Sequence, residues 1–131
     1  DIGNVTFLGY RTGKALHDEI RRSMFLVIPS EWYENNPMTV IEAFALGKPV
    51  LGARIGGIPE LVRDWETGLT YVSGEVADLK EKITLMLERK EKIPEMGRKA
   101  RFLVERELNA EVYYHNLIAI YQKANEKEAK L

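Results

Sequence analysis

The sequence lacks cysteine and carries almost no net charge, and these absences exclude several kinds of chemistry and partner. Without cysteine, its 131 residues form no disulfide and supply no thiolate as a nucleophile or metal ligand. The 19 basic and 20 acidic side chains leave a formal net charge of −1, so no overall basic field favours binding to nucleic acid or to an anionic membrane. No apolar run approaches the length of a membrane-spanning helix, and no signal peptide is visible.

What the sequence does contain is the composition of a folded domain. Hydrophobic residues make up 45% and charged residues 30%, which is typical of a globular chain that can bury a core. We find no internal repeat, low-complexity tract or linker, so residues 1–131 are expected to form one domain. The chain begins with Asp1 rather than methionine and soon enters an apolar run; we expect it to be part of a longer polypeptide.

Apolar runs and amphipathic segments alternate along the chain. The run 25–28 is continuously apolar, and 50–53 is a second candidate of this kind, as in strands buried on both faces of a parallel sheet. Further strands are expected at 5–9 and 68–72. Helices are expected at 12–23, 38–46 and 58–62, from 76, around 96–104 after a break at Pro94, and from an Asn109 cap to about 121. The fold class is therefore α/β, a parallel sheet flanked by helices, with a helical C-terminus.

Two unusual loops follow the strands at 25–28 and 50–53. Residues 29–37 and 54–59 each run directly into a helix, and the carboxyl ends of parallel strands meet at one edge of the sheet, where ligands bind. A helix N-terminus presents unpaired N–H groups and a partial positive charge, which favour an anion. Gly56 and Gly57 leave room for a close approach of a ligand to the backbone. Two such loops together predict a phosphate or diphosphate site.

Two glutamates accompany these loops. Glu42 lies inside the nearly apolar helix 38–46, where we expect it to be buried at a cost in free energy, and Glu34 lies in the preceding loop. Carboxylate oxygens accept hydrogen bonds from vicinal hydroxyls, so one glutamate suits a ribose and the other a hexose, with phosphates between them. Alternatively, Glu34 is only a solvated loop residue, Glu42 is partly exposed or paired with Lys48, and the glycines mark only a turn.

The stretch ENNPMTVIE, residues 34–42, has a glutamate, seven residues and a second glutamate. Further matching residues surround it: Pro29-Ser30 before it, residues 42–50 after it, then 56–62 and 67–69. The ordered series resembles the retaining glycosyltransferases of family 4 (group 1), whose GT-B architecture has two Rossmann-like domains. This resemblance implies that the chain is a Rossmann-like parallel sheet flanked by helices, half of a GT-B fold.

The resemblance also implies roles for matching positions. Glu34 contacts the transferred sugar and orients it without acting as a nucleophile, and Glu42 binds the ribose hydroxyls. The remaining donor contacts come from backbone amides of the loop and helix start, from the glycine loop, and from a residue near the base: Asn36, Met38, Thr39, Gly56, Gly57 and Tyr10. No metal and no cofactor are expected; the donor substrate is a nucleotide-sugar such as a UDP- or GDP-sugar.

The chain departs from the family pattern in three respects. The acceptor-binding N-terminal domain is absent. So is the Arg and Lys pair that neutralises the diphosphate, and none of the basic residues Arg11, Lys14, Lys48 and Arg54 can be assigned to that role. The C-terminal helix of the family crosses to the other domain. Here its aromatic and apolar residues are expected to be left exposed or to drive self-association: Tyr113, Tyr114, Leu117 and Tyr121.

We therefore expect the donor-binding part of a retaining glycosyltransferase that transfers a hexose to an unidentified acceptor, with negligible activity in the isolated chain. The alternatives are a nucleotide-binding module without catalysis, part of a GT-B nucleotide-sugar epimerase, and a helical interaction domain. A cytoplasmic location is expected, with peripheral membrane attachment of a longer parent left open.

Overall fold

Six α-helices and three strands alternate along residues 2–128, the part of the chain that the computed structural model describes. The elements, in order, are α1 (Gly13–Arg22), β1 (Leu26–Ile28), α2 (Met38–Ala45), β2 (Val50–Ala53), α3 (Ile58–Leu61), β3 (Gly68–Tyr71), α4 (Val76–Glu88), the short 3₁₀ helix η1 (Lys90–Lys92), α5 (Ile93–Glu107) and α6 (Ala110–Glu128). The alternation confirms the α/β class. The sequence predicts a charged helix end at residues 129–131, and these residues lie outside the described part of the chain.

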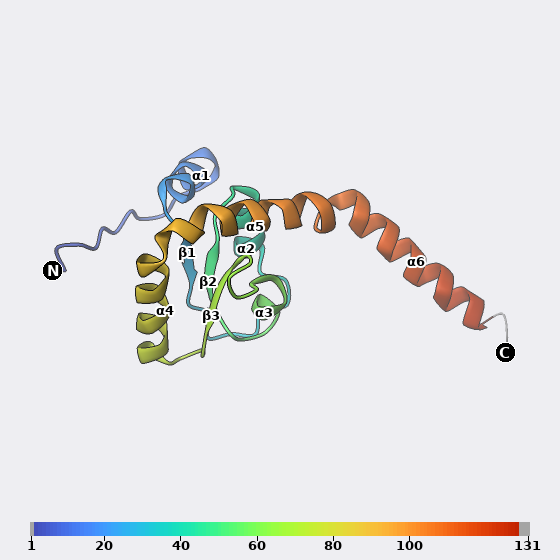
Figure 1. Cartoon of the computed structure of the whole chain (residues 1–131). Coiled ribbons are helices and arrows are strands. Elements are labelled where there is room, and N and C mark those ends of the chain that lie inside the picture. Colours follow the sequence, from blue (N-terminus) through green and yellow to red (C-terminus); the bar gives the residue numbers. More distant parts are fainter. Residues whose placement is uncertain (1, 129–131) are drawn as a thin grey trace.

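The three strands form one parallel sheet in the order β1-β2-β3. The central strand β2 is buried at every residue, because helices cover both faces (Figure 1). Its side chains alternate between the two faces, with Val50 packing on one side and Leu51 on the other. A Cβ at position 52 would lie 2.5 Å from a methyl group of Ile58, so the close packing of α3 on β2 favours glycine at this position.

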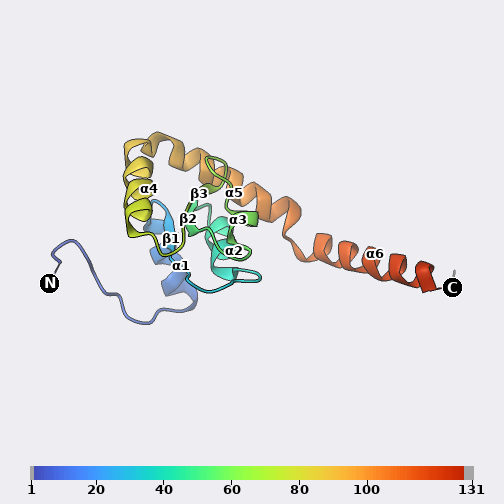
Figure 2. The ribbon, with the colours of Figure 1, turned by 90° about the horizontal axis from the view of Figure 1, so that it is seen from below.

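Two hydrophobic clusters, one on each face, hold the helices to the sheet. The first joins α2, α3 and α5 to β2 and contains Val40, Ala43, Phe44, Val50, Ile58, Val62, Ala100 and Leu103. The second joins α4 and α5 to β2 and β3 and contains Leu51, Ala53, Leu69, Tyr71, Met86, Ile93 and Met96. Since α5 contributes to both, it closes the domain across one end of the sheet (Figures 1 and 2).

The break between α4 and α5 falls slightly earlier than the sequence indicated. Helix α4 ends at Glu88, η1 follows, and Pro94 lies in the first turn of α5, where its missing N–H is tolerated. Further along α5, Gly97 meets the turn after α2. A Cβ at Gly97 would lie 2.2 Å from the carbonyl oxygen of Gly47, so glycine permits this close helix packing.

The predicted strand at 5–9 is wrong. Residues 2–10 form no strand, and every one of them is exposed; Phe7 is 94% exposed. The β-branched and aromatic residues favour an extended backbone locally, but a strand also requires a neighbour to accept and donate its ladder bonds. No strand within residues 2–128 takes that position.

Helix α6 begins at the predicted cap and then leaves the rest of the chain (Figures 1 and 2). The side-chain oxygen of Asn109 accepts a hydrogen bond from the Val112 N–H at 2.9 Å, as an N-cap residue does. Tyr113, Tyr114 and Tyr121 are exposed, as expected, whereas Leu117 is half-buried. No helix within residues 2–128 has the length and apolar character needed to cross a membrane.

Candidate functional site

The candidate site is the carboxyl edge of the sheet, where the segments after β1, β2 and β3 meet. The backbone N–H of Gly57, after β2, donates to the carbonyl oxygen of Glu34, after β1, at 2.6 Å. The hydroxyl of Ser73, after β3, donates to the carbonyl oxygen of Ser30 at 3.1 Å. The two loops that sequence reasoning placed at one edge are therefore in direct contact, and the third segment is bound to them.

The glycine pair is required by this contact between loops. A Cβ on Gly56 would lie 2.5 Å from the Glu34 carbonyl oxygen, and one on Gly57 would lie 2.6 Å from the Asn35 carbonyl oxygen. Gly56 also has φ +55, which other residues rarely adopt. We expected the glycines to admit a ligand to the backbone; the structure shows that they admit the neighbouring loop. Their contact with a donor stays a prediction.

The start of α2 offers free hydrogen-bond donors at this edge. The N–H groups of Val40 and Ile41 bond to the carbonyl oxygen of Pro37. By contrast, the N–H groups of Asn36, Met38 and Thr39 have no protein acceptor within residues 2–128. All three residues are exposed, so these donors are open to a ligand. They are the backbone groups that sequence reasoning assigned to the donor, and their position suits an anion.

The start of α3 offers less than expected. Helix α3 is only one turn long. The N–H of Ile58 bonds to the Ile55 carbonyl oxygen and that of Gly57 to Glu34, while Pro59 has none to donate. Both loops do run into helices at this edge, as expected, but the N–H groups without a protein acceptor within residues 2–128 lie mainly at the start of α2. An anion site there stays a prediction.

Glu42 is exposed rather than buried, which corrects our expectation. The buried residues of α2 are Val40, Ala43 and Phe44, which share one face of the helix. Glu42 lies on another face, so its carboxylate keeps its water and carries no large desolvation cost. The apolar composition of the helix concealed this one-sided burial.

Within the part of the chain that the structure describes, neither Glu34 nor Glu42 is neutralised by a basic side chain. No ion pair within residues 2–128 involves Glu34 or Glu42. Lys48, the alternative partner of Glu42, lies beyond the other end of α2 and lines a cavity with α5 residues. Glu34 is half-buried and accepts a hydrogen bond from the Ser30 hydroxyl at 3.3 Å. Both carboxylates are therefore free to accept further hydrogen bonds.

Sequence reasoning missed a polar network on β3. The guanidinium of Arg54 donates to the Thr70 hydroxyl at 3.1 and 3.3 Å. That hydroxyl and the Thr70 N–H donate in turn to the Asp64 carboxylate at 3.1 and 2.6 Å. Arg54 follows β2 and is thus a basic residue beside the carboxyl edge. No local sequence pattern connects these three residues, since their pairing depends on the alignment of β2 with β3.

Tyr10 is not joined to the other candidates. It lies in the segment before α1, which forms no helix or strand, and is 92% exposed. No described hydrogen bond or hydrophobic cluster connects it to the carboxyl edge. Its expected contact with the nucleotide base stays a prediction, as does the absence of a metal. Within residues 2–128, no three acidic or histidine side chains gather into a potential metal site.

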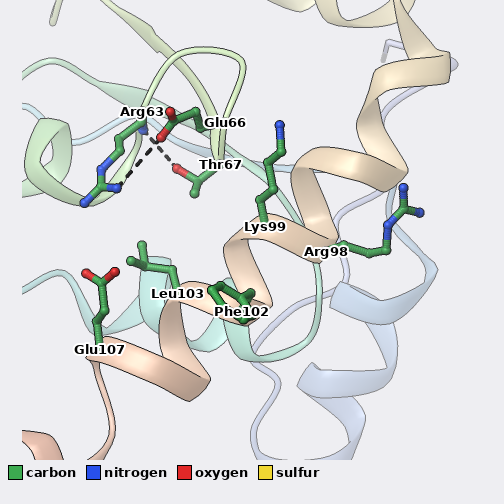
Figure 3. A pocket seen from close by; sticks show the side chains of 8 residues that line it. All are labelled: Arg63, Glu66, Thr67, Arg98, Lys99, Phe102, Leu103 and Glu107. Atoms are coloured by element: carbon green, nitrogen blue, oxygen red, sulfur yellow. Dashed lines mark hydrogen bonds and ion pairs between the residues drawn. The ribbon is translucent and has the colours of Figure 1, made fainter.

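Cavities lie both at this edge and away from it. A small cavity of about 110 Å³ lies between the segment after β1 and the start of α4, and the buried Tyr71 lines it. Burial and the nearby Glu31 carboxylate raise the pKa of the Tyr71 phenol. A larger cavity of about 530 Å³ lies along α5 (Figure 3). There, the Thr67 hydroxyl is already bonded to Arg63 and Leu61, so its polar group is not free for a ligand.

Comparison with known proteins assigns the chain to a family. The family described as glycosyl transferases group 1 matches residues 2–103. An uncharacterized glycosyltransferase of Methanocaldococcus jannaschii is 33% identical over 91 residues, which is 70% of this chain and 26% of that protein. The D-inositol 3-phosphate glycosyltransferase of Gordonia bronchialis is 36% identical over 101 residues, 77% of this chain and 22% of that protein.

Solved structures share the fold. HepE of Anabaena, in complex with UDP and glucose, superposes with a TM-score of 0.75 at 24% identity, over 99% of this chain and 33% of that one. Sucrose-phosphate synthase from Thermosynechococcus elongatus gives a TM-score of 0.67 at 27% identity, over 78% of this chain and 26% of that one. The parallel sheet flanked by helices thus resembles GT-B glycosyltransferase structures.

The match also defines how much of such a protein is present. The chain spans about a quarter of the length of the curated relatives named above. The matched residues 2–103 include all three strands and the whole carboxyl edge. From this match over most of its length, the chain belongs to the glycosyl transferases group 1 family.

Proposed function

We propose that this chain is the donor-binding part of a retaining, family 4 glycosyltransferase that transfers a hexose from a nucleotide-diphospho-sugar to an acceptor. The observation that carries the proposal is the start of α2. The N–H groups of Met38 and Thr39, which have no acceptor within residues 2–128, lie in the sequence between Glu34 and Glu42, which form no ion pair in the same residues. The named relatives are glycosyltransferases, and a structure of the same fold holds UDP and glucose.

The diphosphate is assigned to the N-terminus of α2. Met38 and Thr39 are exposed residues whose N–H groups are unbonded within the described residues, and the helix dipole adds a partial positive charge there. The nearby carboxylates do not suit phosphate, because like charges repel. They suit the hydroxyls on either side of it, since carboxylate oxygens accept O–H hydrogen bonds.

The two glutamates are assigned to different parts of the donor. Glu34 is half-buried and held by the loop, as expected of a group that orients a reacting sugar. Glu42 is exposed one turn inside α2 and is assigned to the ribose hydroxyls. Because Glu42 is exposed, it does not carry the desolvation cost that the sequence predicted for it. The assignment to the ribose therefore depends on its position and on the family resemblance.

The reaction would depend on stabilising the departing diphosphate. Helix N–H groups aimed at a developing negative charge act as preorganised electrostatic catalysts. A retaining enzyme of this kind delivers the acceptor hydroxyl to the face from which the diphosphate leaves, and Glu34 orients the sugar instead of attacking it. No metal is invoked in this scheme, and the acceptor and the diphosphate-neutralising cations are assigned to the remainder of a longer protein. We therefore infer negligible turnover by this chain alone.

Titration calorimetry of the 131-residue chain with UDP, GDP, ADP and UDP-glucose tests the proposal. We expect one nucleotide to bind best, and Glu42→Ala to weaken binding of nucleotide and nucleotide-sugar alike. Loss of one charged hydrogen-bond acceptor corresponds to roughly a 10-fold loss of affinity. Glu34→Ala should weaken UDP-glucose while leaving UDP unchanged. Glu88→Ala, an exposed glutamate at the end of α4, is the matched control.

Three results would each overturn a part of the proposal. Absence of binding for every nucleotide and nucleotide-sugar would remove the donor-binding role of this chain. Unchanged affinity in Glu42→Ala would remove the ribose assignment alone. Robust sugar transfer by the purified chain would refute the inference that it is inactive. A nucleotide-binding module without catalysis would bind UDP and UDP-glucose equally, with no effect of Glu34→Ala on the difference between them.

A further inference from the structure

Glu34 is held directly by hydrogen bonds from the segments after β1 and β2, and indirectly, through Ser30, by the segment after β3. Its side-chain oxygen Oε1 accepts from the Ser30 hydroxyl at 3.3 Å. Its carbonyl oxygen accepts from the Gly57 N–H at 2.6 Å. Ser30 is itself held, because its carbonyl oxygen accepts from the Ser73 hydroxyl at 3.1 Å. A loop glutamate that is merely solvated would need none of these contacts.

We propose that Ser30 is a positioning residue for the Glu34 carboxylate, and that Ser73 holds Ser30 in place. The proposal rests on the proposed function, because it assigns the oriented carboxylate to the donor sugar. Ser30 acts through Glu34 and is not assigned a contact with the donor.

The hydrogen-bonding groups of Ser30 and Glu34 support the proposal that Ser30 orients Glu34. Serine has one O–H to donate, and Ser30 directs it to Glu34 rather than outward. The second carboxylate oxygen of Glu34 has no bond within residues 2–128 and stays open to a sugar hydroxyl. A free glutamate side chain would lose rotamer freedom when it binds a ligand. Holding it beforehand reduces that loss, which is the general advantage of a preorganised site.

Ser73 extends this restraint to the third strand. It lies 43 residues after Ser30 in the chain, and their hydrogen bond joins the segment after β3 to the start of the loop that carries Glu34. Ser73 is half-buried, as is Ser30, so solvent competes only in part for the bond. Removing the Ser73 hydroxyl should therefore loosen Ser30 and affect Glu34 indirectly, with a smaller effect than loss of Ser30 itself.

Calorimetry with UDP and UDP-glucose on Ser30→Ala, Ser30→Thr and Ser73→Ala tests the proposal. The 3.3 Å bond is long for O–H···O, so we expect Ser30→Ala to weaken UDP-glucose by roughly 3- to 10-fold, less than is usual for one hydrogen bond to a charged group. UDP binding should not change. Ser30→Thr, which retains the hydroxyl, should restore UDP-glucose affinity. Ser23→Ala, which removes a half-buried serine hydroxyl bonded to Ile20 at 2.8 Å at the end of α1, is the control.

Three-bond NMR couplings about the Cα–Cβ bond of Glu34 provide a readout that needs no ligand. The wild-type chain should show one dominant rotamer, and Ser30→Ala should show averaging among rotamers. If the couplings do not change, Ser30 does not orient Glu34 and the proposal is overturned. It is also overturned if Ser30→Ala weakens UDP as much as UDP-glucose, because the hydroxyl would then support the loop in general.

These readouts separate failure of the inference from failure of the proposed function. If the wild-type chain binds neither compound, the donor-binding role fails, and the couplings still decide whether Ser30 orients Glu34. If UDP-glucose binds and Ser30→Ala leaves both its affinity and the couplings unchanged, the proposed function stands and the positioning role is refuted.

Discussion

Substitution of Gly57 by alanine tests the contact that forms the carboxyl edge. Gly57 has φ −78, a conformation that alanine adopts readily. Backbone strain is thus excluded, and only the added methyl group matters. That group would lie 2.6 Å from the Asn35 carbonyl oxygen and 3.2 Å from that of Glu34, whereas real Cβ contacts are essentially never below 3.0 Å.

The chain can relieve this overlap only by moving the loop that carries Glu34 away from α3. That movement stretches the 2.6 Å hydrogen bond from the Gly57 N–H, which is worth about 1 kcal/mol. Overpacking adds a cost, and such changes typically total about 1–3 kcal/mol. The loop around Glu34 is largely exposed and can yield, so we expect a value toward the lower end. For a chain of this size, 1 kcal/mol lowers Tm by roughly 3–5 °C.

Urea and thermal unfolding, followed by circular dichroism, measure this loss. Gly3→Ala is the control, because a Cβ at Gly3 meets nothing within 4 Å. We expect Gly3→Ala to leave the free energy of unfolding unchanged and Gly57→Ala to reduce it. A Gly57→Ala variant within about 0.5 kcal/mol of the wild type, the usual range for surface changes, would show that the two loops are not packed against each other.

Three further predictions concern other contacts. Gly97→Ala should destabilise by about 1–3 kcal/mol despite the better helix propensity of alanine, because its Cβ would overlap the Gly47 carbonyl oxygen; urea unfolding with an unchanged midpoint would contradict this. Asn109→Ala should destabilise α6 by about 1 kcal/mol. Amide hydrogen exchange in the first turn of α6 should then be faster, as measured by hydrogen–deuterium exchange and mass spectrometry. The Val72 N–H donates to the Asp78 carboxylate and lowers its pKa from the ordinary value of 3.8. The ionised carboxylate therefore stabilises the fold above pH 3.8, and this stabilisation is lost as the pH falls through the lowered pKa. In Asp78→Asn, the free energy of unfolding should decrease less steeply as the pH is lowered.

Much of the fold was predictable because its signals are local. The apolar run at 25–28 and the candidate strand at 50–53 became β1 and β2 of a parallel sheet. Asn109 capped α6 as its residue type and position indicated. Signals that depend on neighbours failed: the β-rich segment 5–9 has no partner strand within the described residues, and the apolar helix around Glu42 is covered on one face only.

The features of the candidate site also separate into those that the sequence indicated and those that depend on distant segments. Parallel strands bring their carboxyl ends to one edge, so the order of strands and loops in the sequence already indicated that the two loops would lie at the same edge. That Gly56 and Gly57 contact the loop of Glu34 directly was shown only by the structure. The spacing of Glu34 and Glu42 around a helix start indicated which ligand to consider.

Only the tertiary structure decided which groups at that edge are free. The N–H of Gly57 is taken by Glu34, whereas those of Met38 and Thr39 have no acceptor within residues 2–128. Ser73 reaches Ser30 across 43 residues. Sequence specifies the residue types and the local backbone, but hydrogen bonds between distant segments and the exposure of a side chain depend on how the sheet and helices pack in space.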